Sequence, residues 1–325
     1  MLKRLSLLLP LAMTLPAAVR IEKITYKGWP NSYRITNGEV ELVVVTDIGP
    51  RIMRYAFVGG PNLFKEYPEM LGKSGESVWM IRGGHRLWRA PEDKVLSYGL
   101  DNEPASVEVK GDVLTVTSRV EQQTGLQKQI SVKLAPSGSR VEIIHHLKNA
   151  GPHPQRFAAW ALTVMAPGGT AIIGFPPRGK HPDILPPTNP LTMWAYTDFS
   201  DSRWRFTKKY LTLRQDPKAV EPQKTGLFNP ETWGAYLLGT DLFLKRAQAD
   251  PKRQYPDFGC SLETFTNADM LELETLGPLS RVPSGASVEH IEQWSLHRNV
   301  RVSSWTDAGL DNVLLPLLSS SGKAN

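Results

Sequence analysis

The chain has a single cysteine, Cys260, in 325 residues, so no disulfide can form within it and its stability must come from a packed core. Lysine and arginine form no dense cluster. The formal net charge of +6 falls to +4 when residues 1–18 are left out, because Lys3 and Arg4 are the only charged residues there. Proteins that bind nucleic acid concentrate their positive charge, so we expect no nucleic-acid partner. The sequence also lacks a glycine-rich phosphate loop and alternating strand and helix patterns, which argues against a nucleotide-binding fold, and we expect no cofactor.

Long apolar runs are scarce as well, and the main one lies at the start of the chain. Lys3 and Arg4 precede an apolar stretch over residues 5–15, which ends at Pro16-Ala17-Ala18. A basic start followed by a short apolar run and small residues is typical of an export signal, whereas a membrane span needs about 20 apolar residues. We therefore predict a signal peptide over residues 1–18, a periplasmic or secreted protein and no membrane span.

Short β-rich segments separated by turns make up most of the remaining sequence. Their links are short and include the hairpin signal Asn37-Gly38, so neighbouring strands are expected to pair antiparallel. Residues 157–165 are apolar on both faces, which predicts a central strand buried between two layers. The pattern indicates an all-β fold, a large antiparallel sandwich, as one domain over residues 19–300. A C-terminal extension follows over 301–325, with a helix at 307–318. Residues 168–190, rich in Gly and Pro, are predicted to form a long loop at the rim of a site.

A glutamate interrupts one of these strand patterns near the C-terminal end. Glu263 lies in the strand-like run GCSLETF at 259–265, and a turn at 266–269 leads to a second strand that places Glu272 and Glu274 on one face. A carboxylate on a rigid strand can act as a general base in fixed geometry. Alternatively, Glu272 and Glu274 form the solvated face of a half-buried sheet.

The run GGHRLW at 83–88 is a second candidate for chemistry. Two glycines let a backbone approach a ligand, and they precede His85, Arg86 and Trp88. A pyranose stacks on aromatic rings such as Trp88 and Trp160, while Arg82 or Arg86 could clamp a uronate carboxylate. The alternative is an exposed histidine beside a structural arginine, with both tryptophans in the core.

Polar and aromatic residues are also concentrated at 194–204. Tyr196, Asp198 and Arg203 are candidates to orient sugar hydroxyls. Asp198 and Asp201 fall short of the six to eight oxygen ligands that calcium takes, so we expect no metal. The pair His145-His146 is a poor metal site, because neighbours on a strand face opposite sides.

Several of these stretches resemble one family of proteins. GCSLET at 259–264 resembles the segment around the catalytic glutamate of aldose 1-epimerases, and residues 273–294 resemble the closing strands of galactose mutarotase-like proteins. Asn37-Gly38, DIGPRI at 47–52 and GGPNLF at 59–64 look like the opening of the same superfamily. The resemblance covers about residues 20 to 298. Within it, GGHRLWRAPE at 83–92 and WAYTDFSDSRW at 194–204 look like a bacterial group of this superfamily.

The resemblance implies a β-supersandwich that holds a sugar on a concave face, with a glutamate base and a histidine acid. The glutamate corresponds to Glu263. The histidine of the epimerases lies on a central strand after an Asn-x-Gly-like turn, where this chain has Asn149-Ala150-Gly151 and then no histidine on the strand. We therefore predict that His85 takes its place. The predicted site combines Glu263 and His85 with the binding residues Arg82, Arg86, Trp88, Trp160, Tyr196, Asp198, Arg203 and Glu274.

Three function classes follow from these features. The first is an exported sugar epimerase or other isomerase with Glu263 as base. A polysaccharide lyase acting on a uronate-containing glycan is the second, and a non-catalytic sugar-binding module is the third. All three predict a mono- or oligosaccharide partner, acidic if an arginine clamps it. We expect a monomer.

Overall fold

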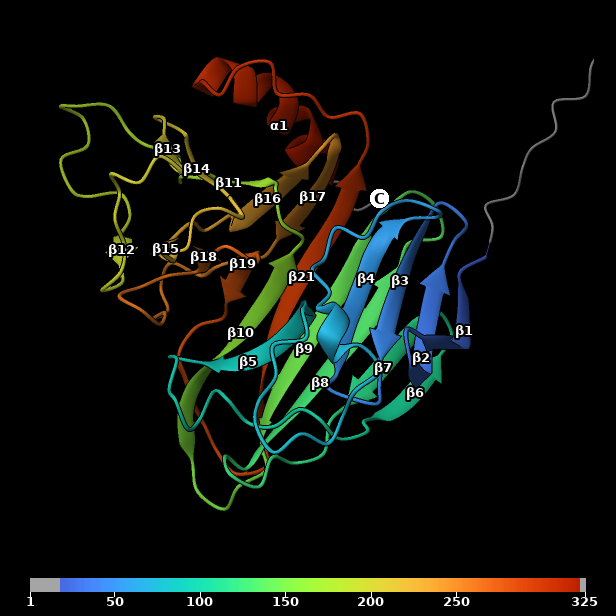
Figure 1. Cartoon of the computed structure of the whole chain (residues 1–325). Coiled ribbons are helices and arrows are strands. Elements are labelled where there is room, and N and C mark those ends of the chain that lie inside the picture. Colours follow the sequence, from blue (N-terminus) through green and yellow to red (C-terminus); the bar gives the residue numbers. More distant parts are fainter. Residues whose placement is uncertain (1–17, 322–325) are drawn as a thin grey trace, which may run out of the picture.

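The computed structural model describes residues 18–321, so nearly all of the predicted signal peptide lies outside the described residues. Two large antiparallel sheets are packed face to face (Figure 1). The eleven-stranded sheet runs, in spatial order, through β1 (Arg20–Tyr26), β2 (Trp29–Thr36), β3 (Val40–Val45), β4 (Arg51–Phe57), β5 (Gly84–Ala90), β10 (Gln155–Met165), β19 (Leu271–Leu276), β18 (Leu262–Thr266), β15 (Gln223–Leu227) and β12 (Leu191–Met193), with β20 (Ser280–Val282) beside β10.

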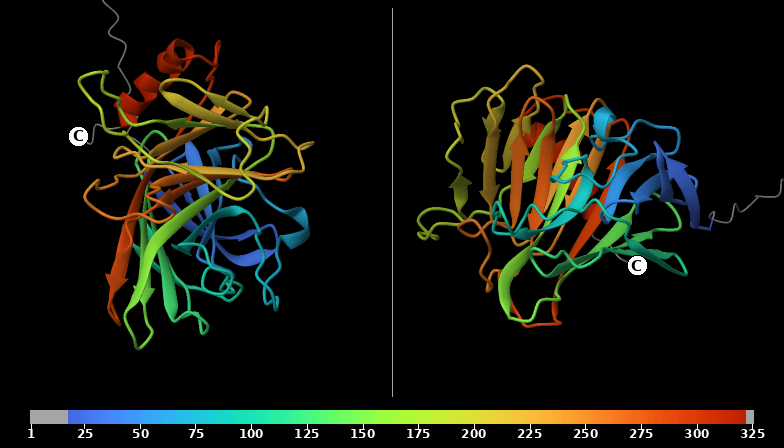
Figure 2. Two further views of the ribbon diagram at one scale, coloured as in Figure 1. Left: turned by 90° about the vertical axis from the view of Figure 1, so that its left-hand side faces the viewer. Right: turned by 60° about the horizontal axis from the view of Figure 1, so that its bottom comes forward.

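The ten-stranded sheet forms the other layer. Its spatial order is β13 (Trp204–Phe206), β14 (Tyr210–Arg214), β11 (Thr170–Gly174), β16 (Trp233–Leu238), β17 (Asp241–Arg246), β21 (Ser287–His297), β9 (Val141–Asn149), β8 (Leu126–Leu134), β7 (Val113–Thr117) and β6 (Ser106–Lys110). The blue strands of the first part of the chain and the orange and red strands of the last part belong to one body in both views (Figure 2). The predicted all-β antiparallel sandwich is confirmed.

Sequence pattern and burial agree along most strands. In β8 and β9, residues alternate between buried and partly exposed, as expected for strands with one face on the core and one in water. From Phe157 onward β10 is buried throughout, as predicted for a central strand. Thr36 pairs with Glu41 around Asn37-Gly38, and Gly38 has a φ of +90°, which that hairpin turn requires.

An aromatic cluster fills the space between the sheets. Tyr55, Phe64, Phe243 and Trp294 contact one another with ring centroids 5.5 to 6.3 Å apart, and all four are buried. Such rings supply much of the buried apolar area, so they are the centre of the core.

The C-terminal helix covers the outer side of the ten-stranded sheet. Helix α1 (Asp307–Ser321) extends slightly past the predicted range, and its buried Leu310 and Leu314 pack on a cluster that includes Leu242 and Leu244 of β17 (Figure 1). No helix among residues 18–321 is long and apolar enough to span a membrane.

One loop prediction needs correction. Residues 168–190 were expected to lack regular structure, but 170–174 form strand β11, because Ala171, Ile172 and Ile173 are an apolar run that is buried between β14 and β16. Residues 175–190 have no strand or helix.

Candidate functional site

The face of the eleven-stranded sheet turned away from the other sheet carries an unusual set of polar side chains. Register places them together: Leu162 of β10 lies opposite both Arg86 of β5 and Glu274 of β19, and Glu274 lies opposite Glu263 of β18. Side chains two residues apart share a face. We call this set the outer-face cluster; it comprises Arg86, Trp88, Trp160, Lys224, Glu263, Glu272 and Glu274.

Lys224 lies at the centre of this cluster. Its Nζ is 2.9 Å from Glu263 Oε2 and 3.1 Å from Glu274 Oε2, and Trp160 Nε1 donates a 2.8 Å hydrogen bond to the same oxygen of Glu274. The ammonium group also lies 4.8 Å from the ring centroid of Trp160 and 4.7 Å from that of Trp194. One cation therefore serves two fully buried carboxylates.

Burial and the shared cation shift the pKa values of Glu263 and Lys224. Burial raises the pKa of Glu263 well above its usual range, and the opposite charge of Lys224 only partly offsets this. Burial lowers the pKa of Lys224, but the charges of Glu263 and Glu274 outweigh it and hold that pKa well above normal. Lys224 is thus protonated, and Glu263 is a carboxyl group with high proton affinity, the property of a general base or acid.

A second ion pair extends the cluster toward β5. Arg86 Nη2 donates to Glu272 Oε1 at 3.0 Å, and its guanidinium lies 4.5 Å from the ring of Trp88 and 5.4 Å from that of Trp79. Burial raises the pKa of Glu272, while the charge of Arg86 lowers it. Glu272 and Glu274 are therefore not a solvated face, and the interpretation of this pair as exposed carboxylates is wrong.

Several buried polar atoms of this face have no hydrogen-bond partner. Buried polar groups are nearly always paired, so such a row of free donors and acceptors marks a surface suited to a polar ligand. The atoms are Glu263 Oε1, Glu274 Oε1, Arg86 Nε and Nη1, Trp88 Nε1 and Trp79 Nε1.

A cavity of about 640 Å³ adjoins this face. It is lined by Glu92, Asp93, Lys94, Tyr98, Trp194 and Asp257. Tyr98 packs on Trp88 with centroids 4.7 Å apart, and Trp194 covers Lys224, so the two aromatic walls connect the cavity to the outer-face cluster. Its volume is typical of small-molecule sites.

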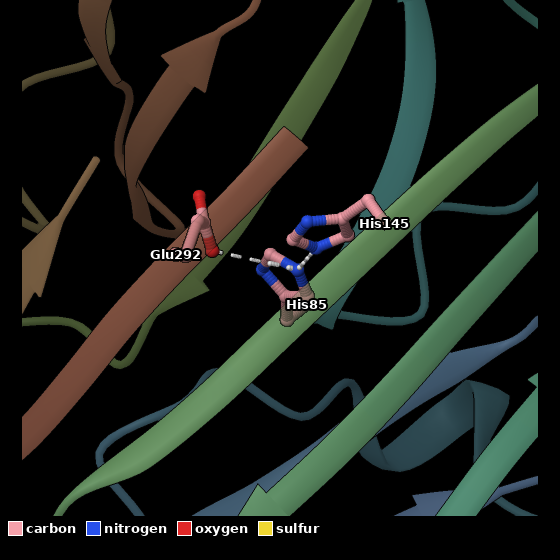
Figure 3. Close-up of side chains that lie close together, drawn as sticks. All are labelled: His85, His145 and Glu292. Atoms are coloured by element: carbon pink, nitrogen blue, oxygen red, sulfur yellow. Dashed lines mark hydrogen bonds and ion pairs between the residues drawn. The ribbon is translucent and has the colours of Figure 1, made fainter. Parts of the chain in front are cut away.

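His85 does not belong to this face. Neighbours on a strand point to opposite sides, so His85 and Arg86 cannot enter one site, and His85 lies in the space between the sheets (Figure 3). There its Nε2 is 2.8 Å from His145 Nε2 and its Nδ1 is 2.8 Å from Thr163 Oγ1. The prediction that His85 and Glu263 face each other across a sugar is therefore wrong.

The two glycines before His85 also have a different role from the predicted one. A Cβ on Gly83 would lie 2.0 Å from the carbonyl oxygen of Lys65, and one on Gly84 would lie 2.5 Å from that of Ile52. Both residues have positive φ. The glycines thus let β5 approach its own neighbouring backbone, rather than a ligand.

His85 is part of a buried polar network between the layers. We call it the interlayer network; it comprises His85, His145, Lys245 and Glu292 with the hydroxyls of Thr163 and Thr275. His145 Nδ1 donates to the carbonyl of His290 at 2.9 Å, so its Nε2 accepts from His85. Lys245 Nζ lies 2.8 Å from Glu292 Oε1, and Trp294 Nε1 donates to Glu292 Oε2 at 2.8 Å.

His85, His145 and Glu292 are ligand types that zinc accepts, and their atoms lie within 4.8 Å of one another (Figure 3). Each of these nitrogens and oxygens nevertheless has a partner within the network, and Lys245 already supplies the positive charge beside Glu292. Burial lowers the pKa of His85 and of His145. We therefore interpret the interlayer network as a structural element of the core.

The remaining predicted binding residues lie apart from the outer-face cluster or at its edge. Arg82 is buried and bound to Glu76, and Arg203 is held by Asp201 at 2.8 Å, so neither guanidinium is free to clamp a carboxylate. Asp198 accepts hydrogen bonds from Ser200 within its own turn. Tyr196 packs on Phe265, on the same face as Glu263, and burial raises its pKa to about 12.

Sequence reasoning missed Lys224, Trp194, Trp79, Tyr98, Glu92 and Asp257. Lys224 lies on the short strand β15, and the alternation of that strand gives the face of the lysine but not its neighbour. Pairing of β15 with β18, which places Lys224 opposite Phe265, brings its ammonium group to Glu263. The others lie on loops, whose spatial positions no periodicity reveals.

Solved structures with the same arrangement of strands come from several bacteria. A Klebsiella pneumoniae protein assigned provisionally to the aldose 1-epimerases superposes with a TM-score of 0.58 at 13% identity, over 94% of this chain and 88% of that one. A galactose mutarotase-like protein of Lactobacillus casei superposes with a TM-score of 0.54 at 10% identity, over 82% of this chain and 100% of that one. A galactose mutarotase related enzyme of Lactobacillus acidophilus superposes with a TM-score of 0.52 at 8% identity, over 83% of this chain and 98% of that one.

No protein-family model and no curated protein sequence matches the chain. The likeness therefore lies in the order and packing of the strands, and the identities of 8 to 13% establish the fold alone. The chain has the galactose mutarotase-like fold.

Proposed function

We propose that the chain binds a mono- or oligosaccharide in the cavity between Tyr98 and Trp194, against the outer-face cluster. The observation that carries this proposal is the row of buried donors and acceptors without partners, which lies beside aromatic walls. Sugars present hydroxyls that donate and accept hydrogen bonds, together with an apolar ring face that stacks on aromatic side chains. Both requirements are met by the same surface.

We further propose that Glu263 is the base of an aldose 1-epimerase type reaction. Its carboxylate takes the proton of the anomeric hydroxyl, the bond between the anomeric carbon and the ring oxygen breaks, and the ring oxygen takes up a proton. The open aldehyde then closes on its other face. The high proton affinity of Glu263 and its fixed position on β18 support this role.

Lys224 is our candidate for the proton donor that the mechanism needs. Its ammonium group is 2.9 Å from Glu263. Once Glu263 takes up the sugar proton, its negative charge disappears, so the pKa of Lys224 falls and the ammonium becomes a stronger acid. Both groups are nearly inaccessible, so we propose that the sugar hydroxyls replace part of this ion pair.

The variant Glu263→Gln tests this mechanism. Gln keeps the shape of the side chain but cannot accept the proton, so we expect mutarotation, followed by polarimetry of a freshly dissolved aldose, to fall to the uncatalysed rate while sugar binding by calorimetry persists. Asp198→Asn is the matched control, because that carboxylate only caps its own turn. Catalysis by Glu263→Gln at the normal rate would exclude Glu263 as the base.

A non-catalytic sugar-binding protein is the second candidate. It is favoured by the complete burial of Glu263 and its ion pair with Lys224, an arrangement that also serves a purely structural purpose. Sugar binding without mutarotation in the unmodified protein would select this candidate.

We also propose that the protein is exported. The support is the basic and then apolar start of the chain at residues 1–18. Cell fractionation of the native host with N-terminal sequencing tests it: a periplasmic or secreted protein that starts near residue 19 is expected, and an intact Met1 on cytoplasmic protein would contradict it.

A further inference from the structure

The charges around the cavity differ from those that an acidic sugar requires. Three carboxylates line it, Glu92, Asp93 and Asp257, against one ammonium group, Lys94. Beneath the Trp194 wall, two more fully buried carboxylates share Lys224, and each has an oxygen without a hydrogen-bond partner. Negative charge therefore predominates on the walls, and free acceptors lie below them.

Carboxylates outnumber cations around this site, because Lys94 is the single lysine or arginine that lines the cavity beside three carboxylates. Carboxylate recognition in proteins depends on arginine or lysine donors that are free to pair with it. The outer-face guanidinium, Arg86, keeps Nε and Nη1 free, but its charge is offset by Glu272, which pairs with Nη2 at 3.0 Å, and Lys224 is shared between two carboxylates. The three wall carboxylates would repel a further anion, since like charges repel one another.

A protonated amine meets the opposite situation. Ammonium groups bind well to carboxylates and to the faces of aromatic rings, and the cavity offers both, with Asp257 near the Trp194 wall and Glu92 hydrogen-bonded to Tyr98 at 2.5 Å. That hydrogen bond holds the side chain of Glu92 in place. An amine on the sugar ring would thus lie near two negative groups, while the ring stacks on an aromatic wall.

We propose that the cavity selects an amino sugar, a pyranose with a protonated amine, and discriminates against uronates. This inference rests on the proposed sugar site and adds the charge of its substrate. It assigns Glu92 and Asp257 as specificity-determining residues. They act through their charge on the bound amine, and neither takes part in the proton transfer at Glu263.

The test compares four monosaccharides that share the same pyranose ring: glucosamine, N-acetylglucosamine, glucose and glucuronate. Each is titrated into the protein in a calorimeter, at low and at high salt. We expect glucosamine to bind at least about tenfold more tightly than N-acetylglucosamine, which lacks the charge, and glucuronate to bind most weakly. High salt should narrow the advantage of glucosamine, because screening weakens attraction between charges.

The double variant Glu92→Gln with Asp257→Asn should bring the affinities for glucosamine and N-acetylglucosamine together. Glu108→Gln with Asp112→Asn removes the same charge at the β6–β7 hairpin and should leave their ratio unchanged. Binding of glucose without any ranking by charge would overturn this inference and uphold the sugar site. Glucuronate bound as tightly as glucosamine would also overturn it, and no binding of any of the four would overturn both proposals.

Discussion

Removing the charge of Lys224 should destabilise the protein strongly. The variant Lys224→Met keeps the stem of the side chain but leaves Glu263 and Glu274, which are both fully buried, without their shared cation at 2.9 and 3.1 Å. Breaking a buried ion pair from one side typically costs about 3–5 kcal/mol. We expect a loss of this size in the free energy of unfolding, measured by urea denaturation at pH 8.

The loss should depend on pH in a defined direction. Glu263 already has a folded-state pKa above its unfolded value, so its contribution to stability is present at low pH and is lost as pH rises through the folded pKa. Without Lys224 this pKa rises further. The difference between Lys224→Met and the unmodified protein should therefore be larger at pH 8 than at pH 5.

Two further variants serve as a rescue and as a surface control for Lys224→Met. Glu263→Gln in the Lys224→Met background removes one unpaired charge and should recover part of the lost stability. Lys209→Met removes a lysine whose ion pair with Asp311 lies at the surface, so it should change stability little. A loss below about 1 kcal/mol for Lys224→Met, or equal losses at both pH values, would show that the two carboxylates do not depend on this cation.

Three further predictions concern the core. Glu292→Gln leaves Lys245 without its buried partner and should lower the free energy of unfolding by about 3–5 kcal/mol, while glucosamine binding by the folded protein persists in calorimetry. Burial lowers the pKa of His290 to about 3, so its stabilising contribution should be lost as pH falls from about 6.5 towards 3, and its NMR signals should still report a neutral ring at pH 4. Leu314→Ala, on the buried side of α1, should cost about 2–5 kcal/mol in thermal or urea unfolding.

The fold could be predicted from the sequence because its determinants are local. The alternation in the strands, the Asn37-Gly38 turn and the continuous burial of 157–165 each follow from side-chain pattern and turn chemistry. The predicted hairpin of β18 and β19 was also correct, and it positions Glu263 opposite Glu274.

The residues of the candidate site could be predicted only where they lie on strands. Glu263, Arg86, Trp88, Trp160 and Glu274 share one face, as register and contacts place them. His85 lies elsewhere, because the alternation of β5 places it on the face opposite to Arg86 and Trp88, just as neighbouring positions on β9 separate His145 from His146. The loop residues around the cavity depend on long-range packing, which no sequence period records.

The charges on both sides of β5 also determine how this strand pairs with β10. A slip of one residue in β5 would move Arg86 into the interlayer network and His85 onto the outer face. Lys245 would then face a second buried cation, and Glu272 would lose its partner. An apolar strand could tolerate such a slip, but this one cannot. The ionic groups therefore fix the alignment of the sheet, so the residues that equip the candidate site also specify the fold against its nearest misfolded alternative.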